Sequence, residues 1–368
     1  MKKTVMSIVA LACAALVCSC GGNKGVKVEK GNPAEMDSLS YCMGANVGTS
    51  LKYRYGELQF NIEEFKNGLQ DGLTNKSNQS YTDVFKTLNT FFTERVSERY
   101  QSYQQKLESD STAVFNPFDS EEERHEISYA FGLLHSKDVA QMKMPLKYYW
   151  LLKGFQDSYE GSTEIPEQDV RGVLQKYFMI TRPAQAAERS AKWLEKKEKA
   201  FGVKKTESGL LYKVVKSGDM EKAAKSDEDV VKVHYVGKLQ DGTVFDASLF
   251  KNRSKEQQEM MRLQRPAMFD EKGNLLDAEE PIEFPLNRVI KGWTEGMKLV
   301  GPGGKIKLYI PAELAYGPRG GGQLIGPNEA LEFEVELLEV IPAVVEEAPA
   351  AEAEAAPAAE EVKAEPAK

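Results

Sequence analysis

The stretch "VHYVGKLQDGTVFDAS", Val233–Ser248, decides the fold of the C-terminal half of the chain. Two short runs with alternating apolar residues flank Gln240–Thr243, and the Asp-Gly pair in this segment is a strong signal for a tight hairpin turn. The alternation puts Tyr235 on the apolar face of the first run and His234 on the opposite face. The stretch therefore predicts an antiparallel hairpin with an aromatic face.

Further strands are predicted on both sides of this hairpin. Short runs alternate between apolar and polar residues, and turn signals separate them, which is typical of an antiparallel sheet. The runs are "LLYKVV" (210–215), "VVKVHYVGKL" (230–239), "KIKLYIP" (305–311) and "LEFEVELLEVI" (331–341).

A short helix is predicted among these strands, in "PLNRVIKGWTEGM" (285–297). Val289, Ile290 and Trp293 follow the spacing i, i+1, i+4, which places them on one side of a helical turn. Alone, such a turn is an ordinary core element. We expect the sheet to wrap around it.

The region before the sheet reads as helical from about 37 to 200, and it contains an internal repeat. Three pairs of similar segments occur in the same order, 86 or 88 positions apart. We therefore predict two copies of a three-helix unit, at 37–110 and 125–204, which pack on each other. The pairs are "LSYCMGANVG" (39–48) with "ISYAFGLLHS" (127–136), "FKNGLQDG" (65–72) with "LLKGFQDS" (151–158), and "DVFKTLNTFF" (83–92) with "DVRGVLQKYF" (169–178).

The third helix of the second copy is expected to be long, running from about Glu167 towards residue 201. Pro183 should kink or interrupt it, because proline lacks the N–H that the helix interior requires. The helix would be a rigid arm that lifts the C-terminal domain away from the repeats.

The two ends of the chain have their own signals. Two lysines, an apolar run and small residues predict a signal peptide at 1–19. "VCSC" resembles a lipobox, with Cys20 as the residue to be lipidated and Cys18 as the alternative. We expect a polar tether at 20–36 and a disordered Pro/Ala/Glu-rich tail at 342–368.

Composition excludes several classes of function. The 368 residues carry a net charge of −8 without a basic stretch in the folded part, which argues against nucleic acid as a partner. Apart from the three cysteines of the leader, only Cys42 is a thiol, so no disulfide framework is expected. His125 and His135 are isolated, and the glycine-rich loops lack a phosphate-binding context. We expect neither a metal nor another cofactor.

If the strands and the short helix form one sheet domain, its aromatic side chains converge on one cavity. Asp246 would be the only charged group in it. The alternative is an ordinary sheet core, since aromatic residues in strands are usually buried. The converging residues are Tyr235, Phe245, Phe284, Val289, Ile290, Trp293, Tyr316, Ile325 and Phe333.

These residues lie in motifs that resemble the FKBP-type peptidyl-prolyl isomerases over about 205–341. The helical region is similar to that of the macrophage infectivity potentiator-like lipoproteins in this family. The resemblance implies a multidomain α and α+β fold: two helical units, then an FKBP-like antiparallel sheet wrapped on a short helix. The motifs are "GLLYKVVKSG", "VHYVGKLQDGTVFDAS", "VIKGWTEGM", "GGKIKLYIPAELAYGPRG" and "ALEFEVELLEV".

The resemblance also implies a role for each pocket residue. In the family pattern, Tyr235 and Phe245 match the walls, Asp246 the adjacent polar group, Trp293 the floor and Tyr316 a hydroxyl donor. Phe284 matches the edge, Val289 and Ile290 match positions whose backbone meets the ligand, and Ile325 and Phe333 match the far wall.

Two features depart from the family pattern. The insertion at 248–281 is much longer than the usual loop and starts beside Asp246, so it is either a lid, a client-binding flap or partner site, or a tolerated surface loop. Gly321 stands where many members carry a larger side chain, which predicts a mobile loop after Tyr316.

The function expected from the resemblance is isomerisation of X–Pro bonds in unfolded or nascent exported proteins. The protein would lie in the cell envelope of a Gram-negative bacterium, anchored by its lipid to the periplasmic face of the outer membrane. The alternative is an envelope chaperone or interaction protein with little isomerase activity. The repeat predicts a monomer with an internal pseudo-dimer, and a homodimer is the alternative.

Overall fold

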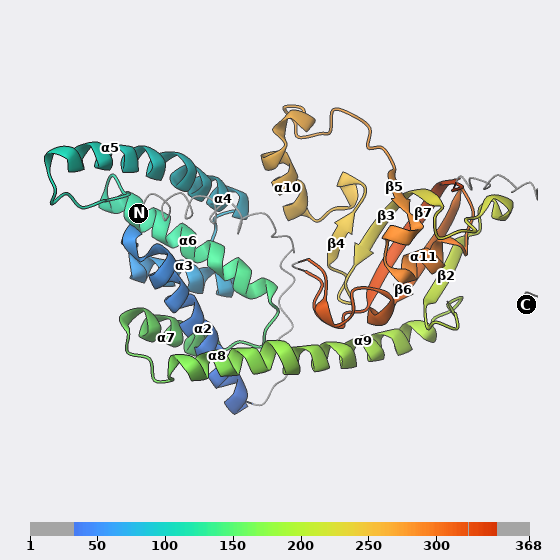
Figure 1. Cartoon of the computed structure of the whole chain (residues 1–368), viewed down its shortest axis with the longest axis horizontal. Helices are drawn as coiled ribbons and strands as arrows, with labels where there is room; N and C mark the ends of the chain where they lie inside the picture. Colours follow the sequence, from blue (N-terminus) through green and yellow to red (C-terminus); the bar gives the residue numbers. More distant parts are fainter. Residues whose placement is uncertain (1–32, 323, 344–368) are drawn as a thin grey trace, which may run out of the picture.

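The computed structural model describes residues 33–322 and 324–343 (Figure 1). A helical region comes first, and a seven-stranded antiparallel sheet with a short helix against it follows, so the predicted fold class is confirmed. The proposed leader, the lipidated cysteine and the acidic tail after residue 343 lie outside the described residues. The predicted tether is too long, because a helix already begins at Pro33. Proline suits a first helical position, where its missing N–H would have no partner.

The helices of the first half are capped at several starts by polar side chains. The side chains of Asn61, Ser80 and Ser120 each accept a hydrogen bond from the backbone N–H three residues further on. The helical elements up to the sheet are α2 (Pro33–Tyr55), η1 (Gly56–Leu58), α3 (Ile62–Thr74), α4 (Tyr81–Thr90), η2 (Phe91–Arg95), α5 (Val96–Ser109), α6 (Glu121–Gln141), α7 (Tyr148–Glu160), α8 (Glu167–Lys176), η3 (Tyr177–Thr181) and α9 (Arg182–Glu198).

Each long third helix contains one π-helical turn, η2 in the first half and η3 in the second. The two turns begin 86 positions apart, which is the offset of the repeat. The second turn ends at Thr181, just before Pro183, but the residue that matches Pro183 in the first half is Ser97, and the same turn occurs there. The interruption belongs to the repeated unit, so the expectation that Pro183 causes it is wrong.

The two halves of the helical region pack on each other, as the repeat predicted. Helix α2 lies against α7, and α3 lies against α6. Glycine permits both contacts: a Cβ at Gly44 would lie 1.8 Å from the carbonyl oxygen of Leu151, and one at Gly132 would lie 2.0 Å from that of Phe65. These two contacts are equivalent positions of the repeat, so the halves are related by a pseudo-two-fold axis.

Polar contacts obey the same pseudo-symmetry. The hydroxyl of Tyr41 donates to Asp157 Oδ2 at 2.8 Å, and the hydroxyl of Tyr129 donates to Asp71 Oδ2 at 2.9 Å. Because each pair joins one half to the other, the halves form one folded unit.

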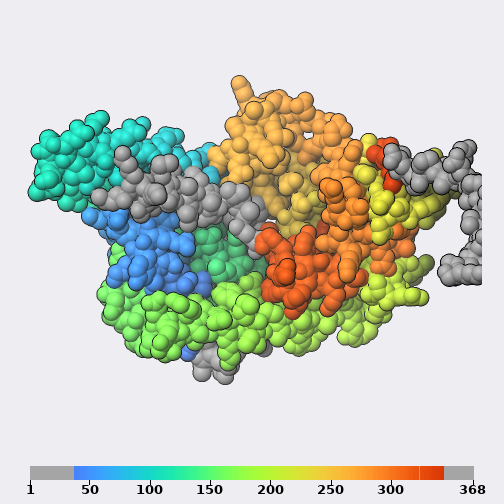
Figure 2. Space-filling model, in the orientation of Figure 1, coloured from blue at the N-terminus to red at the C-terminus, as the bar shows by residue number. Residues whose placement is uncertain are grey.

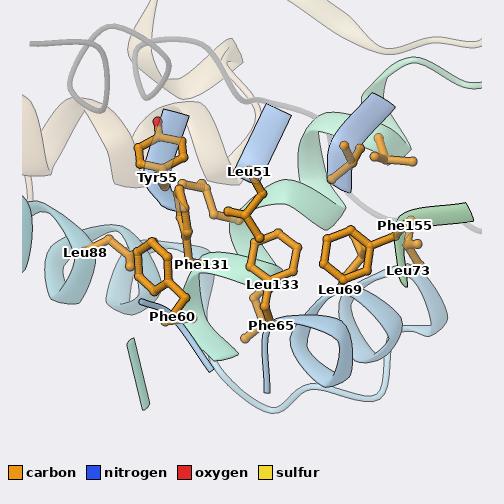
Figure 3. Close-up of a cluster of buried hydrophobic side chains, with 14 of the residues drawn as sticks. Leu51, Tyr55, Phe60, Phe65, Leu69, Leu73, Leu88, Phe131, Leu133 and Phe155 are labelled. Carbon is orange, nitrogen blue, oxygen red and sulfur yellow. The ribbon is translucent and has the colours of Figure 1, made fainter. Parts of the chain in front are cut away.

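The core of the helical region is aromatic and draws on both halves (Figure 3). The rings of Phe65 and Phe155 stack at 5.1 Å, and Phe131 meets Phe60 at 5.1 Å and Tyr55 at 5.0 Å. Each such ring contributes about 1.5–3 kcal/mol by leaving water, so this unit is held by packing. Across residues 33–322 and 324–343, the structure contains no helix with the length and apolar character needed to span a membrane.

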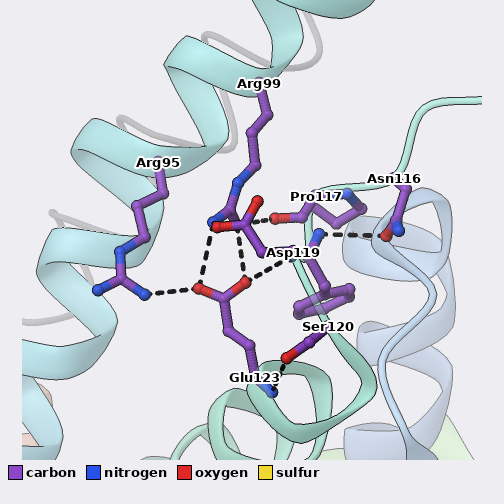
Figure 4. A network of polar contacts seen from close by, with 8 residues as sticks. Arg95, Arg99, Asn116, Pro117, Asp119, Ser120 and Glu123 are labelled. Carbon is purple, nitrogen blue, oxygen red and sulfur yellow. Dashed lines mark hydrogen bonds and ion pairs between the residues drawn. The ribbon is translucent and has the colours of Figure 1, made fainter.

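An ion-pair network fixes the connection between the halves (Figure 4). Arg99 on α5 contacts Asp119 and Glu123 and donates to the carbonyl oxygen of Pro117. Arg95 pairs with the same Glu123. The network ties α5 to the start of α6, where the chain turns back into the second half.

The sheet has the strand order β1-β2-β6-β7-β3-β4, and β5 also pairs with β3. The predicted hairpin is confirmed: Gly237 pairs with Asp246, and the Leu239 N–H donates to the carbonyl of Thr243 at 2.9 Å. The strands are β1 (Lys204–Lys205), β2 (Leu211–Lys216), β3 (Val230–Lys238), β4 (Val244–Ala247), β5 (Ile282–Pro285), β6 (Gly304–Ile310) and β7 (Leu331–Ile341). The helix of this domain is α11 (Lys291–Met297), and short 3-10 turns lie at η4 (Met220–Lys222), η7 (Leu286–Arg288), η8 (Ala312–Leu314) and η9 (Gly317–Arg319).

Helix α9 does not hold the sheet domain away from the repeats, so this expectation is wrong: Lys143, between α6 and α7, pairs with Asp241 in the turn between β3 and β4. The C-terminal half of α9 lies along the domain (Figure 1): Trp193 packs on Tyr309 with ring centroids 5.7 Å apart. Ser190 donates to the carbonyl of Asn328 at 2.7 Å and accepts from Gln240 Nε2 at 2.7 Å. Ala186 and Ser190 of the arm are buried, and Trp193 is half-buried against Tyr309.

The insertion at 248–281 is a folded segment. It contains η5 (Phe250–Asn252), helix α10 (Lys255–Gln264) and η6 (Pro266–Met268). The guanidinium of Arg262 lies over the rings of Phe250 and Phe269, 4.9 and 5.9 Å from their centroids. This small core gives the insertion a defined shape.

Candidate active site

The centre of the aromatic cluster is Trp293, on α11. Its ring meets Tyr235 of β3 and Phe333 of β7, each at 5.2 Å and nearly perpendicular. Edge-to-face contacts of this kind are favourable for aromatic rings. All three side chains are buried, and their rings come from three different elements, so the fold of the whole domain fixes their positions.

Two half-buried rings extend the cluster towards solvent. Phe245 of β4 packs on Phe333 at 5.5 Å, and Phe284 of β5 packs on Trp293 at 5.6 Å. Half-buried aromatic faces beside a buried tryptophan offer an apolar surface to a small ring.

Gly237 permits this arrangement and was missed as a site residue. A Cβ at Gly237 would lie 2.6 Å from the ring of Phe245 and 2.9 Å from that of Phe333. A glycine inside an otherwise apolar strand signals such a close approach. The sequence therefore carried a usable clue.

The polar end of the cluster is formed by Asp246. The Tyr235 hydroxyl donates to Asp246 Oδ2, and Arg253 Nη1 lies 3.9 Å from Asp246 Oδ1. Burial, with the hydrogen bond to Asp246 next, raises the pKa of Tyr235 above its usual value. Burial and the charge of Asp246 also raise the pKa of Tyr316. Both hydroxyls therefore remain protonated donors near neutral pH.

Val289 and Ile290 lie outside the helix that was predicted to contain them. Helix α11 begins at Lys291, and both residues are extended, with φ,ψ of −106°,173° and −64°,148°. Their branched side chains favour extended backbone over a helix start. The Ile290 carbonyl accepts from the N–H of Trp293 at 2.8 Å, so the residue caps the helix that carries the tryptophan.

One buried side-chain donor at the cluster lacks an acceptor within the part of the chain that the structure describes. It is the indole Nε1 of Trp293. Among the hydrogen bonds of Ile290, its carbonyl accepts from the N–H of Trp293 and of Thr294. A buried donor without a partner is costly, so the indole N–H is suited to a bound carbonyl group.

The loop after Tyr316 completes the site. Ile325 is buried in the same core as Trp293, whereas the Tyr316 ring is 41% exposed. Gly321 and Ile325 exchange two backbone hydrogen bonds, at 2.9 and 3.2 Å. A Cβ at Gly321 would lie 2.7 Å from the Tyr316 ring, so this glycine lets the loop close on the tyrosine. Mobility of the loop stays a prediction.

The structure thus brings the predicted residues of the sheet domain to one end of one core, with Tyr316 at its edge, and Cys20 lies outside the described residues. Within residues 33–322 and 324–343, His, Cys, Asp and Glu side chains form no group of three able to hold a metal ion. The candidate site consists of aromatic rings, hydroxyls, an N–H donor and the carboxylate of Asp246.

Two family models match the chain. The model described as FKBP-type peptidyl-prolyl cis-trans isomerase matches residues 221–338. The model described as the domain amino terminal to FKBP-type peptidyl-prolyl isomerase matches twice, at 36–122 and 124–214.

Curated relatives resemble the chain over the greater part of their own length. The FKBP-type 22 kDa peptidyl-prolyl cis-trans isomerase of Escherichia coli (strain K12) is 36% identical over 223 residues, which cover 58% of this chain and 94% of that protein. FkpA of the same strain is 37% identical over 234 residues, 61% of this chain and 76% of that protein. The outer membrane protein MIP of Legionella longbeachae is 34% identical over 229 residues, 59% of this chain and 86% of that protein. The chain therefore belongs to the FKBP-type peptidyl-prolyl cis-trans isomerases, enzymes that act on proline-containing proteins.

Proposed function

We propose that the aromatic cluster around Trp293 is where this isomerase binds and rotates the X–Pro bond. The observation that carries the proposal is the convergence of Tyr235, Trp293 and Phe333 from three elements, with Phe245 and Phe284 half-exposed beside them. The prolyl ring would lie on the indole, between these rings.

Rotation about a peptide bond requires no nucleophile. The barrier is about 18–20 kcal/mol because the twisted amide loses its resonance. The twisted amide also has less charge separation than the planar one, so an apolar site that excludes water disfavours the planar state relative to the twisted state. X–Pro bonds suit such catalysis because their two isomers are nearly balanced and exchange in tens to hundreds of seconds.

The polar groups of the site would orient the substrate. In this proposal the Tyr316 hydroxyl and the Ile290 N–H donate to carbonyl oxygens on either side of the proline. Asp246 holds the Tyr235 hydroxyl and polarises that end of the site. Val289, Ile325 and Phe333 complete the walls.

The assay of this function is cis–trans exchange of a short proline peptide, measured with the chain from residue 21 onwards. An exchange rate above the uncatalysed rate supports the proposal. A wild-type chain that is folded but does not accelerate the exchange contradicts the proposal.

The clients are proposed to be unfolded or nascent exported proteins in the cell envelope. Supporting this, residues 1–19 have the pattern of a signal peptide, and Cys20, or alternatively Cys18, is in a lipobox-like context. One relative is named an outer membrane protein. Lipidation would anchor the protein to the outer membrane, facing the periplasm. Metabolic labelling with a fatty-acid analogue tests this: the wild type should take up the label, and Cys20→Ser should lose it.

We also infer that the domain division follows the repeat, with units at 37–110 and 125–204, the isomerase domain at 205–341 and the insertion at 248–281. The pairing of α2 with α7 and of α3 with α6 supports a monomer that contains its own pseudo-dimer. A homodimer is the alternative.

A second function, binding of unfolded chains, is favoured by one asymmetry between the helical halves. Met179 and Ile180 are 72% and 65% exposed, and their counterparts 86 positions earlier are Thr93 and Glu94. At these two positions of the repeat, only the second half exposes apolar side chains, which suggests a contact surface for clients. Met179→Thr with Ile180→Glu should weaken suppression of aggregation of an unfolded protein and leave peptide isomerisation unchanged. An unchanged aggregation assay would remove this function.

A further inference from the structure

The insertion touches the site through the free edge of strand β4. Strand β4 carries Phe245 and Asp246, and it pairs with β3 on one side only. On its other side, Nε2 of Gln257, in the first turn of α10, donates to the carbonyl oxygen of Phe245 at 3.3 Å and lies 3.5 Å from that of Val244. The backbone of a site residue is thus held by a side chain from the insertion.

The orientation of the Gln257 side chain is fixed at both ends. Its Oε1 accepts from the N–H of Ser254 at 2.9 Å, and Ser254 Oγ accepts from the Gln257 N–H at 3.1 Å. This reciprocal capping box leaves only Nε2 free to reach β4. The amide therefore joins the start of α10 to the strand in a single orientation.

The base of the insertion is closed as well. Glu279 Oε1 accepts from the Phe250 N–H at 2.6 Å, which joins the two ends of the inserted segment. Arg262 donates from Nε to the carbonyl oxygen of Gly273 at 2.9 Å while lying over two aromatic rings. These contacts hold the insertion together, so a shift at one of its ends would also move the other.

The far side of α10 rests on the helical region. Helix α10 packs on α4, and Thr82 Oγ1 donates to Glu259 Oε2 at 3.1 Å. Figure 2 shows the insertion, in light orange, meeting the blue-green helical region at the upper edge of the molecule. One short helix therefore contacts both the helical region and strand β4.

We propose that α10 is a strut between the helical region and the active site, and that Gln257 is a positioning residue for Phe245. The proposal rests on the proposed function of the aromatic cluster and names the element that holds its outer wall. It also assigns the insertion a role other than that of a lid.

The test compares two Gln→Glu substitutions on the same helix, in the chain from residue 21 onwards. Gln257→Glu keeps an acceptor for the Ser254 N–H but removes the donor and sets a carboxylate against the Phe245 carbonyl. Gln264→Glu, at the exposed end of α10, makes the same chemical change away from β4. Four quantities are to be measured: kcat/KM on a short proline peptide, the Kd of a proline peptide analogue, amide hydrogen exchange in β4 and the midpoint of thermal unfolding.

The strut predicts a loss confined to Gln257→Glu. Its kcat/KM should fall at least about fivefold and its Kd rise in parallel, because a small displacement of a positioning group reduces productive binding. Exchange of the β4 amides should accelerate, and both variants should unfold within about 3 °C of the wild type. Equal activity of the two variants, or a loss of activity that global unfolding explains, would overturn the proposal.

Two more variants separate the strut from a lid and from a surface loop. Thr82→Val removes the anchor on α4, and the strut predicts faster β4 exchange in this variant also. A lid predicts instead that deleting residues 251–278 raises turnover of the short peptide, and a surface loop predicts no change; either result overturns the strut. If the wild-type chain itself is inactive, the proposed function fails, whereas an active wild type with an unaffected Gln257→Glu sinks the strut alone.

Discussion

At the scale of single residues, the site depends on close contacts that only glycine allows. Gly237 lets the rings of Phe245 and Phe333 meet, and Gly321 lets the neighbouring loop close on Tyr316. Strand alternation predicted the face on which Tyr235 lies, and the resemblance to the family supplied the other aromatic residues. Neither predicted Gly237, because the contact depends on the positions of rings from two other strands.

Asp138 is a residue where the helical repeat is broken, since its counterpart 88 positions earlier is Ser50. It lines a pocket of about 150 Å³ together with Arg54 and His135. Burial raises the pKa of Asp138 from 3.8 to about 6, and burial lowers the pKa of His135. The half-buried carboxylate of Asp138 therefore opposes folding once it is ionised.

Replacing this carboxylate by an amide should stabilise the protein at neutral pH. Above about pH 6 the aspartate is ionised in both folded and unfolded chains and carries its full burial penalty, which fades as the pH falls towards 3.8. Asp138→Asn should raise the free energy of unfolding by on the order of 2–3 kcal/mol at pH 7, with the gain lost near pH 4. Urea unfolding at the two pH values measures it, with the exposed Asp277→Asn as the control. A gain of equal size at both pH values would show that the carboxylate charge is not the cause.

At the scale of elements, prediction succeeded where a pattern was local. The hairpin of β3 and β4 followed from period-two alternation and an Asp-Gly turn. Helix α10 was not predicted, because few of its residues are apolar and only Met260 is buried. Its capping box, Ser254 with Gln257 three residues later, was a readable start signal.

The start of α11 was misread for a related reason. The spacing of Val289, Ile290 and Trp293 fits a helical turn, but the same spacing arises where an extended pair precedes a helix. The hydrogen bond from the Trp293 N–H to the Ile290 carbonyl, at 2.8 Å, decides the boundary, and no periodicity reveals it.

The helix pairs give a sharp test at this scale. In Gly44→Ala the new Cβ would lie 1.8 Å from a backbone oxygen of α7, which cannot move without shifting the helix. The free energy of unfolding should fall by about 3 kcal/mol or more. The matched control is Gly172→Ala on α8, where a Cβ would meet nothing within 4 Å. This substitution should raise the free energy of unfolding by about 0.5–1 kcal/mol. Similar values for the two variants in chemical denaturation would contradict the close packing of α2 on α7.

At the scale of the whole molecule, two copies of the helical unit are followed by a single isomerase domain. Helix α9 leads into the sheet domain, while its counterpart α5 turns back through a loop. Phe115 of that loop packs on Tyr100 and Tyr103 of α5, at 5.5 Å from each. The face of α5 that carries Tyr100 and Tyr103 is thus covered by this loop. The sequence revealed the duplication through its constant offset, but not the docking of α9 on the sheet domain, which depends on contacts between distant segments.

The internal pairing predicts the oligomeric state. Because each copy already contacts its counterpart in the same chain, the chain from residue 21 onwards should have the mass of one chain in static light scattering across a wide range of concentration. A stable mass of two chains would contradict the internal pseudo-dimer and favour exchange of copies between chains.

The most direct test of the central claim is the isomerase activity of Phe245→Ala. This ring is half-buried at the outer wall of the cluster, so its removal leaves the buried rings in place. Loss of its apolar contact with the proline should cost about 1.5–3 kcal/mol of transition-state binding, which is roughly a ten- to hundredfold fall in kcat/KM on a short proline peptide. Phe201→Ala, which removes a 95% exposed ring outside the cluster, should retain the wild-type value. A folded Phe245→Ala protein with wild-type kcat/KM would show that the X–Pro bond is not isomerised at this cluster.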